Sequence, residues 1–155
     1  MLDYLPELLK GLHTSLTLTV ASIIVALILS LIFTIILTLK TPGLVWIVRG
    51  YITLFTGTPL LVQLFVVFYG LPSLGIILDP FPAAVIVFSI NEGAYCAETM
   101  RAALESVPVG QMEAGYCVGM SYLQVMRRIV LPQALRTAFP PLSNSLIAMV
   151  KDTSL

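Results

Sequence analysis

Long apolar segments alternate with short polar stretches along the chain. No charged residue occurs from Gly11 to Leu39, a run longer than the ~20 residues that a helix needs to cross the hydrocarbon core of a membrane. We therefore predict a first span over 12–39 that is tilted or projects beyond the core. Further apolar segments cover 51–69 and 83–104, and a last one runs from about 141 to 155. The pattern predicts an all-α integral membrane protein with about four transmembrane helices in a single domain.

Small residues recur every three or four positions along the first apolar segment. They form one stripe: Ser15, Thr19, Ser22, Ala26, Ser30 and Thr34. Small side chains let two helices approach closely in lipid, where the hydrophobic effect itself does not drive association. We interpret the stripe as a surface for helix packing rather than as part of a transport path.

Helix breakers interrupt the other apolar segments. Gly57-Thr58-Pro59 predicts a kink or a break within the second span, because proline leaves backbone groups without their helical partners. The stretch 40–50 is expected to be a loop, and the stretch 70–82 to be rich in turns. Pro140-Pro141 is expected to separate the last span from the residues before it.

The third apolar segment carries most of the polar chemistry. Asn91, Tyr95 and Glu98 lie at i, i+4 and i+7, so they share one face of a helix. Glu92 lies near mid-span, where a carboxylate costs about 2.5–3.5 kcal/mol and is expected to face protein or water. We expect Glu92 to have a functional or partner-facing role.

Glu98 has two interpretations. It lies on the same face as Asn91, but it also precedes Arg101 by three residues, and Arg101 precedes Glu105 by four. Such spacings place opposite charges next to each other on a helix. Glu98 is therefore either a residue of a polar pathway or one partner in a structural ion pair.

The polar stretch between the third and fourth segments predicts two short helices at an angle. Pro108 is expected to open the first helix as its first residue, and Gly119 to close it in the left-handed conformation. Ser121 and Gln124 have the spacing of a capping box that begins the second helix. Pro132 is expected to end it. This stretch, 105–132, is thus expected to form a compact projection that fits a partner.

Composition excludes several classes of protein. Hydrophobic residues make up 58% of the chain and charged residues 10%, far below the roughly 25% typical of soluble domains. The net charge is zero, so nothing indicates nucleic-acid binding. No phosphate-binding glycine loop or zinc-binding motif is present, and the single histidine, His13, argues against an intramembrane enzyme. We expect no catalytic residue and no metal site.

Basic residues are unevenly distributed between the loops, and their distribution predicts the orientation. They flank the second segment and follow the third, whereas the 70–82 stretch has none: Lys40, Arg49, Arg101, Arg127, Arg128 and Arg136. Because lysine and arginine favour the cytoplasmic side, we expect the N-terminus outside and the 105–132 stretch in the cytoplasm.

Several motifs resemble those of the permease subunits of ABC importers, in the branch for polar amino acids such as histidine, glutamine, arginine and cystine. The 105–132 stretch matches the coupling loop of that family at Glu113, Ala114, Gly115, Gly119, Ile129, Leu131 and Pro132, with Gly115 in place of the second alanine. The segments 55–63, 93–98 and 140–155 match as well, although Thr56 replaces a usual arginine and Glu92 replaces a usual small residue.

The resemblance implies a multi-pass permease of the cell inner membrane that works with other subunits. It implies cytoplasmic ABC ATPases docked on the coupling loop, a second permease subunit in a homo- or heterodimer, an amino-acid-binding protein outside the membrane, and contact with lipid. ATP would be bound by the partner ATPase, so no cofactor is expected here. Members of the branch have a five-helix fold, and the chain is expected to lack the last helix after Leu155.

Three further residues are candidates for the substrate pathway because amino acids are zwitterions. Asn144, Lys151 and Asp152 lie in or beside the last span. Lys151 and Asp152 are adjacent and point in different directions on a helix, so each has an alternative role in packing between helices. The alternative function is that of a non-transporting membrane scaffold or an inactive, truncated permease.

Overall fold

The structure is a computed structural model that describes residues 5–153. Within that range every regular element is a helix, which confirms the all-α class. The elements are α1 (Leu5–Leu39), α2 (Leu44–Thr56), α3 (Leu60–Phe65), the π-helical turn η2 (Val66–Gly70), α4 (Leu71–Ser73), α5 (Pro80–Glu105), α6 (Val109–Cys117), α7 (Tyr122–Val125), the π-helical turn η3 (Met126–Val130) and α8 (Leu131–Asp152). The end of the predicted fourth segment, at 154–155, lies outside the described residues.

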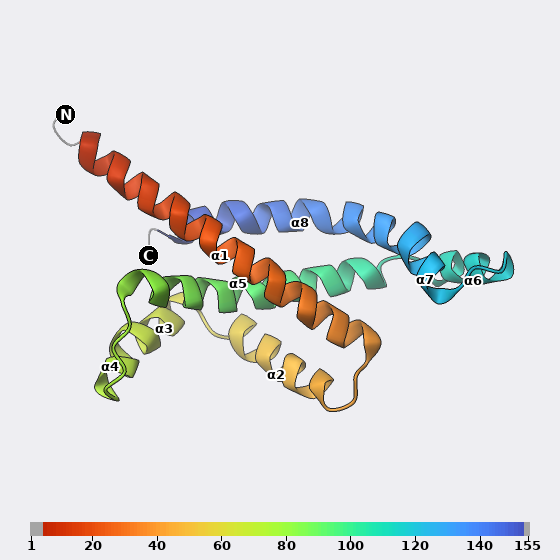
Figure 1. Cartoon of the computed structure of the whole chain (residues 1–155), viewed down its shortest axis with the longest axis horizontal. Coiled ribbons are helices and arrows are strands. Elements are labelled where there is room, and N and C mark those ends of the chain that lie inside the picture. The colour runs from red at the N-terminus through yellow and green to blue at the C-terminus, as the bar shows by residue number, and fades with distance from the viewer. Residues whose placement is uncertain (1–4, 154–155) are drawn as a thin grey trace.

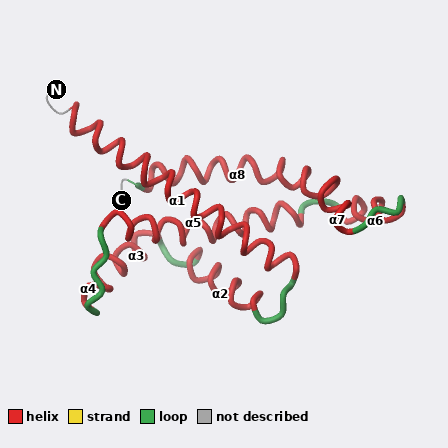
Figure 2. The backbone as a smooth tube through the Cα atoms, in the orientation of Figure 1, coloured by secondary structure: helices red, strands yellow, loops and turns green. Residues whose placement is uncertain are grey.

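Helix α5 is the centre of the arrangement. Helix α1 crosses it diagonally, and α8 runs along its length (Figure 1). Helices α6 and α7 project beyond the bundle at one end, and the arm formed by α3 and α4 extends from the other (Figure 2). The fold thus places the segment 105–132 at one end of the helices.

The contact between α1 and α5 uses the small-residue stripe. Its buried members are Thr19, Ser22, Ala26, Ser30 and Thr34. Ser89 donates a hydrogen bond to the Ser22 carbonyl at 3.2 Å. A Cβ on Gly93 would lie 3.3 Å from the Cβ of Leu29, so the two backbones are nearly as close as side chains permit. The prediction that the stripe serves helix packing is confirmed.

The second apolar segment is broken where the sequence predicts. Helix α2 ends at Thr56, and the chain turns by 99° before it continues as α3 to α4. The hydroxyl of Thr58 donates to the Leu54 carbonyl at 2.8 Å and thus satisfies an acceptor at the end of α2. The predicted loop over 40–50 is wrong, however. Helix α2 begins at Leu44, because its buried side chains Val48 and Ile52 pack with the α1–α5 pair.

The expectation that proline ends the helices near the C-terminus is also wrong. Pro132 lies in the first turn of α8, and Pro140 and Pro141 lie inside it, so the backbone is helical from Tyr122 to Asp152. The π-helical turn η3 immediately precedes Leu131-Pro132, just as η2 precedes Leu71-Pro72. A π turn bonds i to i+5, so it moves the carbonyl with which the proline ring would otherwise clash.

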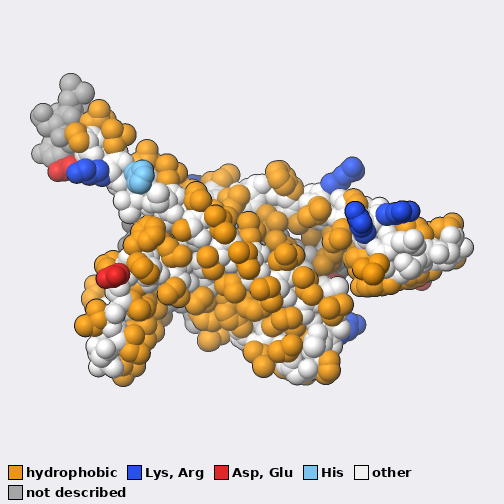
Figure 3. All heavy atoms as spheres, viewed as in Figure 1, with side chains coloured by type: hydrophobic (Ala, Val, Ile, Leu, Met, Phe, Trp, Pro, Cys, Tyr) orange, Lys and Arg blue, Asp and Glu red, His pale blue; other side chains and the backbone are white. Residues whose placement is uncertain are grey.

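Apolar side chains cover much of the surface of the helices (Figure 3). Among the described helices, α1 is long and apolar enough to cross a membrane on its own. Helix α2 and the α3–α4 segment meet the same criterion together, as one span bent by 99°.

Candidate functional site

A polar cavity of about 470 Å³ lies where three parts of the fold meet. The break between α2 and α3 forms one wall, the middle of α5 a second, and the end of α8 a third. Its lining is Thr56, Gly57, Thr58, Pro59, Leu60, Asn91, Glu92, Tyr95, Ser145, Ala148 and Asp152. This volume is within the usual range for small-molecule sites, about 300–1,000 Å³.

Two carboxylates give the cavity its charge. Glu92 comes from α5 and Asp152 from the last turn of α8, and both line the cavity. Glu92 accepts a hydrogen bond from the thiol of Cys96 at 3.3 Å and another from the hydroxyl of Ser145. The lining includes no lysine or arginine. The arrangement is therefore suited to a cationic group such as an ammonium.

Hydrogen bonds fix the wall formed by the break. The amide of Gln63 donates to the carbonyls of Phe55 and Thr58, each at 3.1 Å, and to the Thr58 hydroxyl at 2.8 Å. From α5, the amide of Asn91 donates to the Phe55 carbonyl at 3.2 Å and to the side-chain oxygen of Gln63 at 3.3 Å. Carbonyls released by the interrupted helix are thus paired by side chains, as a broken helix in lipid requires.

Tyr95 makes a second link between α5 and the break. Its hydroxyl donates to the Thr56 carbonyl at 3.2 Å. Asn91 and Tyr95 therefore lie on one face of α5, as their spacing predicts, and both line the cavity. Their donor groups are already engaged with the backbone, so they shape the wall as much as they offer groups to a ligand.

Only some of the predicted pathway residues come together. Asn91, Glu92, Tyr95 and Asp152 line the same cavity, although they are distributed over two helices. Asn144 and Lys151 are exposed on α8, outside that lining. The cavity takes Ser145 and Ala148 from α8 instead. Ser145 was not among the predicted residues, although it lies with Ala148 and Asp152 at i, i+3 and i+7, a spacing that could have revealed it.

Glu98 is one partner in a structural ion pair, the second of the two interpretations that its spacing allows. It forms an ion pair with Arg101, whose guanidinium also bonds Glu105 at 2.6 Å. Glu98 lines a smaller cavity with Arg49 and Arg101, one that shares no residue with the polar cavity. The structure thus separates Glu98 from the Glu92–Asp152 site.

The α6–α7 pair has its own small core. Val107, Val125, Val130 and Ala134 are buried together there. The turn between the helices uses Gly119 with φ of 79°, in the left-handed region as predicted. The backbone N–H of Ser121 donates to Gln124 at 2.8 Å within the predicted capping box. Pro108 is the N-cap of α6 rather than its first helical residue.

Within that pair, the residues of the predicted coupling loop divide into buried and exposed. Gly115 is buried, and a Cβ at this position would lie 2.7 Å from Cγ2 of Val125. Ile129 is half-buried against the same point, whereas Glu113, Ala114, Leu131 and Pro132 are exposed. The buried members hold the two helices together, and the exposed ones are available to a partner.

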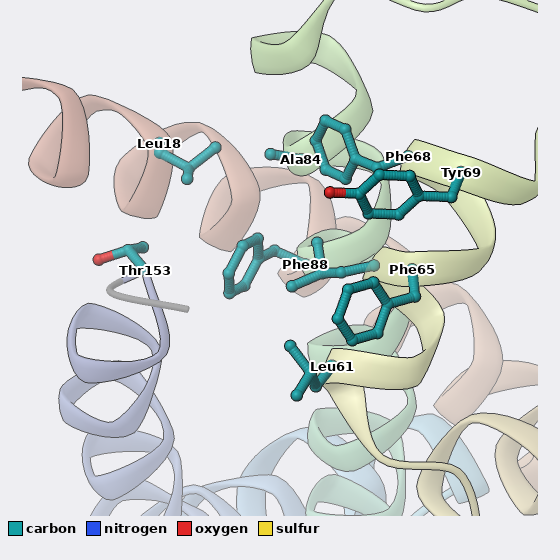
Figure 4. Close-up of a pocket in the computed structure, with 9 residues that line it drawn as sticks. Leu18, Leu61, Phe65, Phe68, Tyr69, Ala84, Phe88 and Thr153 are labelled. Atoms are coloured by element: carbon teal, nitrogen blue, oxygen red, sulfur yellow. The ribbon is translucent and has the colours of Figure 1, made fainter. Parts of the chain in front are cut away.

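A second cavity of about 470 Å³ differs sharply in character. It lies between α1, α5 and the arm of α3 and η2, and its labelled side chains in Figure 4 include Leu18, Phe65, Phe68 and Phe88. Its lining includes no charged residue. The polar cavity is therefore the better candidate for a polar ligand.

Comparison with known proteins identifies the family. Residues 44–155 match the family described as "Binding-protein-dependent transport system inner membrane component". The chain belongs to this family. It is 52% identical to the arginine ABC transporter permease protein ArtM of Escherichia coli strain K12, over 100% of this chain and 74% of that protein. It is 47% identical to the L-cystine transport system permease protein TcyB of Bacillus subtilis strain 168, over 99% of this chain and 65% of that protein.

The fold agrees with this family. A solved structure described as an amino acid ABC transporter with histidines matches with a TM-score of 0.93 and 33% identity, over 99% of this chain and 72% of that one. The predicted resemblance to amino-acid ABC permeases is thus confirmed. As a member of the family of inner membrane transport components, the chain is a permease subunit and not an enzyme, and the alternative of a scaffold is not favoured.

Proposed function

We propose that this permease subunit forms part of the path for a polar amino acid in an ATP-driven importer, and that the polar cavity is its binding point. The observation that carries the proposal is the pairing of Glu92 and Asp152 in a cavity whose lining has no basic residue. Relatives whose names include arginine, cystine and amino-acid transport support a substrate of this class.

The carboxylates would receive the ammonium group of the substrate. Glu92 is held by Ser145 and Cys96, so its position does not depend on the ligand. An ammonium between two carboxylates forms charge-assisted hydrogen bonds and relieves the repulsion between them. The fixed wall made by the break, Asn91 and Tyr95 would then limit the shape of the side chain that enters.

The α6–α7 pair would dock on a cytoplasmic ABC ATPase and transmit its movement. The left-handed Gly119 and the capping box at Ser121 stabilise the pair. These features suit a segment that must keep its conformation while the ATPase moves it. A second permease subunit would complete the path, and an external binding protein would deliver the substrate. The chain would cross the membrane several times with its N-terminus outside. In support, basic side chains concentrate at the end of the molecule that carries α6 and α7 (Figure 3).

A matched pair of carboxylate variants tests the cavity. The complex is reconstituted with its ATPase and binding protein, and ATP hydrolysis is measured against a panel of amino acids. Glu92→Gln with Asp152→Asn removes both charges from the cavity, whereas Glu98→Gln makes the same change on α5 outside it. Hydrogen bonds to charged groups are worth about 1.5–3 kcal/mol, so we expect half-maximal stimulation to need roughly 10- to 100-fold more substrate in the cavity variant.

The Glu98→Gln complex is expected to respond as the parent does. Equal stimulation of the cavity variant and the parent would show that the substrate does not pass these carboxylates. Loss of basal ATP hydrolysis in the cavity variant would instead indicate that the complex does not assemble. In that case the stimulation of the single variant Glu92→Gln is compared with that of the parent.

A further inference from the structure

Three basic side chains from three elements meet where the turn between α1 and α2 approaches α5. Lys40 from the turn, Arg49 from α2 and Arg101 from α5 line a cavity of about 270 Å³. Another cavity of about 270 Å³ adjoins it and shares Arg49 and Arg101. Neither cavity shares a residue with the proposed substrate site.

The cations in this corner exceed the carboxylates. Glu98 and Glu105 are the acidic residues of the two linings, and both are ion-paired with Arg101. Arg49 attracts Glu98 at longer range, but within residues 5–153 neither Lys40 nor Arg49 forms an ion pair. Arg101 thus pairs with both carboxylates, and the three cations against two carboxylates leave the corner with one net positive charge, held by Lys40 and Arg49, for another anion.

The start of α2 adds to the positive potential. Its N-cap is Gly43, which offers no side-chain cap, and the N–H groups of Val45 and Trp46 donate to the carbonyls of Thr41 and Gly43, each at 3.2 Å. The positive end of the dipole of this 13-residue helix is therefore directed at the same corner as Lys40 and Arg49. The positive end of a helix dipole and a guanidinium group favour the same kind of ligand, a phosphate group.

Apolar surface borders the charged corner. Trp46, which lines the cavity, is 77% exposed, and its neighbour Ile47 is 69% exposed. On the other side, Leu39 ends the charge-free part of α1 directly before Lys40. Tryptophan and basic residues mark the level of lipid headgroups in membrane proteins, and basic pockets between helices bind acidic headgroups.

We propose that this cavity binds the phosphate headgroup of an anionic phospholipid, with Lys40 and Arg49 as its principal contacts and Trp46 beside the start of the acyl chains. A lipid fits better than a soluble phosphate because the cationic corner continues into exposed apolar surface. The proposal depends on the membership of an inner-membrane family, and not on the transported substrate.

Trp46 makes the site measurable, because it is the one tryptophan of the sequence. The full chain is reconstituted in vesicles of phosphatidylcholine and phosphatidylglycerol in which either lipid, in turn, carries brominated acyl chains that quench tryptophan fluorescence. Each cation near the surface adds about 1 kcal/mol for an acidic lipid, or roughly fivefold. We expect brominated phosphatidylglycerol to quench Trp46 at least fivefold more effectively per molecule than brominated phosphatidylcholine.

Matched variants separate this site from general surface charge. Lys40→Ala with Arg49→Ala is expected to lower the preference to near one. Arg136→Ala, a cation of α8 outside the cavity, and the charge-keeping pair Lys40→Arg with Arg49→Lys are expected to keep it. The charge-keeping pair also provides the comparison if the alanine variant folds poorly.

Four results would overturn the proposal. The first is equal quenching by the two lipids in the parent. The second is a preference that survives in the alanine variant but fails in Arg136→Ala. The third is thermal stabilisation by inorganic phosphate without any lipid preference, which would make the corner a soluble-phosphate site. The fourth is an alanine variant that keeps the lipid preference but no longer co-purifies with the ATPase, which would show that the corner contacts a protein and not a lipid.

Discussion

Gly115 allows the sharpest test of how the α6–α7 pair is held together. It is the buried residue of α6. In this chain a Cβ there would lie 2.7 Å from Cγ2 of Val125 and 3.0 Å from Cδ1 of Ile129. Carbon atoms in contact are normally about 3.5–4.0 Å apart, so Gly115→Ala requires a movement of close to 1 Å.

The magnitude follows from the residues that must move. Val125 is completely buried and β-branched, so its side chain has one strongly preferred rotamer in a helix and cannot turn away. Overpacking of this kind costs about 1–3 kcal/mol. Alanine regains about 1 kcal/mol over glycine in helix propensity. We therefore expect Gly115→Ala to destabilise the α6–α7 pair by roughly 0–2 kcal/mol.

The informative quantity is the coupling between the two positions. Val125→Ala removes both γ-carbons that the new Cβ would meet, and alone it costs about 2 kcal/mol in lost burial. In the double variant the added methyl group fills part of the space that valine leaves. We expect the double variant to be more stable than the sum of the single effects by at least about 1 kcal/mol.

The free energy of unfolding of each variant is measured in mixed micelles, together with co-purification of the ATPase. Gly110→Ala is the matched control: it lies in the same helix, it is exposed, and a Cβ there would meet nothing within 4 Å. It should be neutral or slightly stabilising. Additivity of Gly115→Ala and Val125→Ala within about 0.5 kcal/mol would refute the proposed packing.

Two other positions give contrasting predictions. Gly119 has φ of 79°, and a Cβ there would meet nothing within 4 Å. Gly119→Val should therefore destabilise the chain by about 1–2 kcal/mol through the backbone alone and reduce co-purification of the ATPase. Gly119→Asn should retain the stability and the co-purification of the parent, because asparagine tolerates the left-handed conformation. Equal behaviour of the two variants would contradict this. Gln63→Leu should destabilise the chain by about 1–3 kcal/mol in thermal unfolding, because the carbonyls of Phe55 and Thr58 lose a donor at the break. Thr58→Val removes only the hydroxyl, which accepts from Gln63 and donates to the Leu54 carbonyl, and leaves both carbonyl bonds of Gln63 in place, so it should cost less. The reverse order would show that Gln63 does not hold the break.

Local signals in the sequence predicted what local forces decide. Gly119 and the Ser121–Gln124 capping box depend on a few neighbouring residues, and the structure has both as predicted. The small-residue stripe on α1 could also be predicted, because close packing of helices in lipid requires small side chains at helical spacing. Asn91 and Tyr95 were placed on one face of α5 by periodicity alone.

Signals that depend on tertiary context were misread. Pro132, Pro140 and Pro141 each favour a helix end, but packing along α5 and the π turn before Pro132 keep the backbone helical. The cavity joins Glu92 to Asp152 across two helices, and no spacing along the chain could assign that pair. Glu98 fitted both a polar helix face with Asn91 and an ion pair with Arg101, and only the side-chain contact with Arg101 in the structure decided between them.

The uninterrupted helical path from Tyr122 to Asp152 would let the proposed permease subunit work as a lever. At 1.5 Å per residue this rod is roughly 45 Å long, with the Gly119 elbow at one tip and a cavity carboxylate at the other. Tilting the rod by about 5° around its elbow end would swing the far tip by roughly 4 Å. Because Glu92 belongs to α5, such a tilt would change the distance between the two carboxylates of the proposed binding point. Under the proposed function, a small rotation at the Gly119 turn would therefore loosen or tighten the hold on the substrate while the hydrogen bonds of the helix stay as they are.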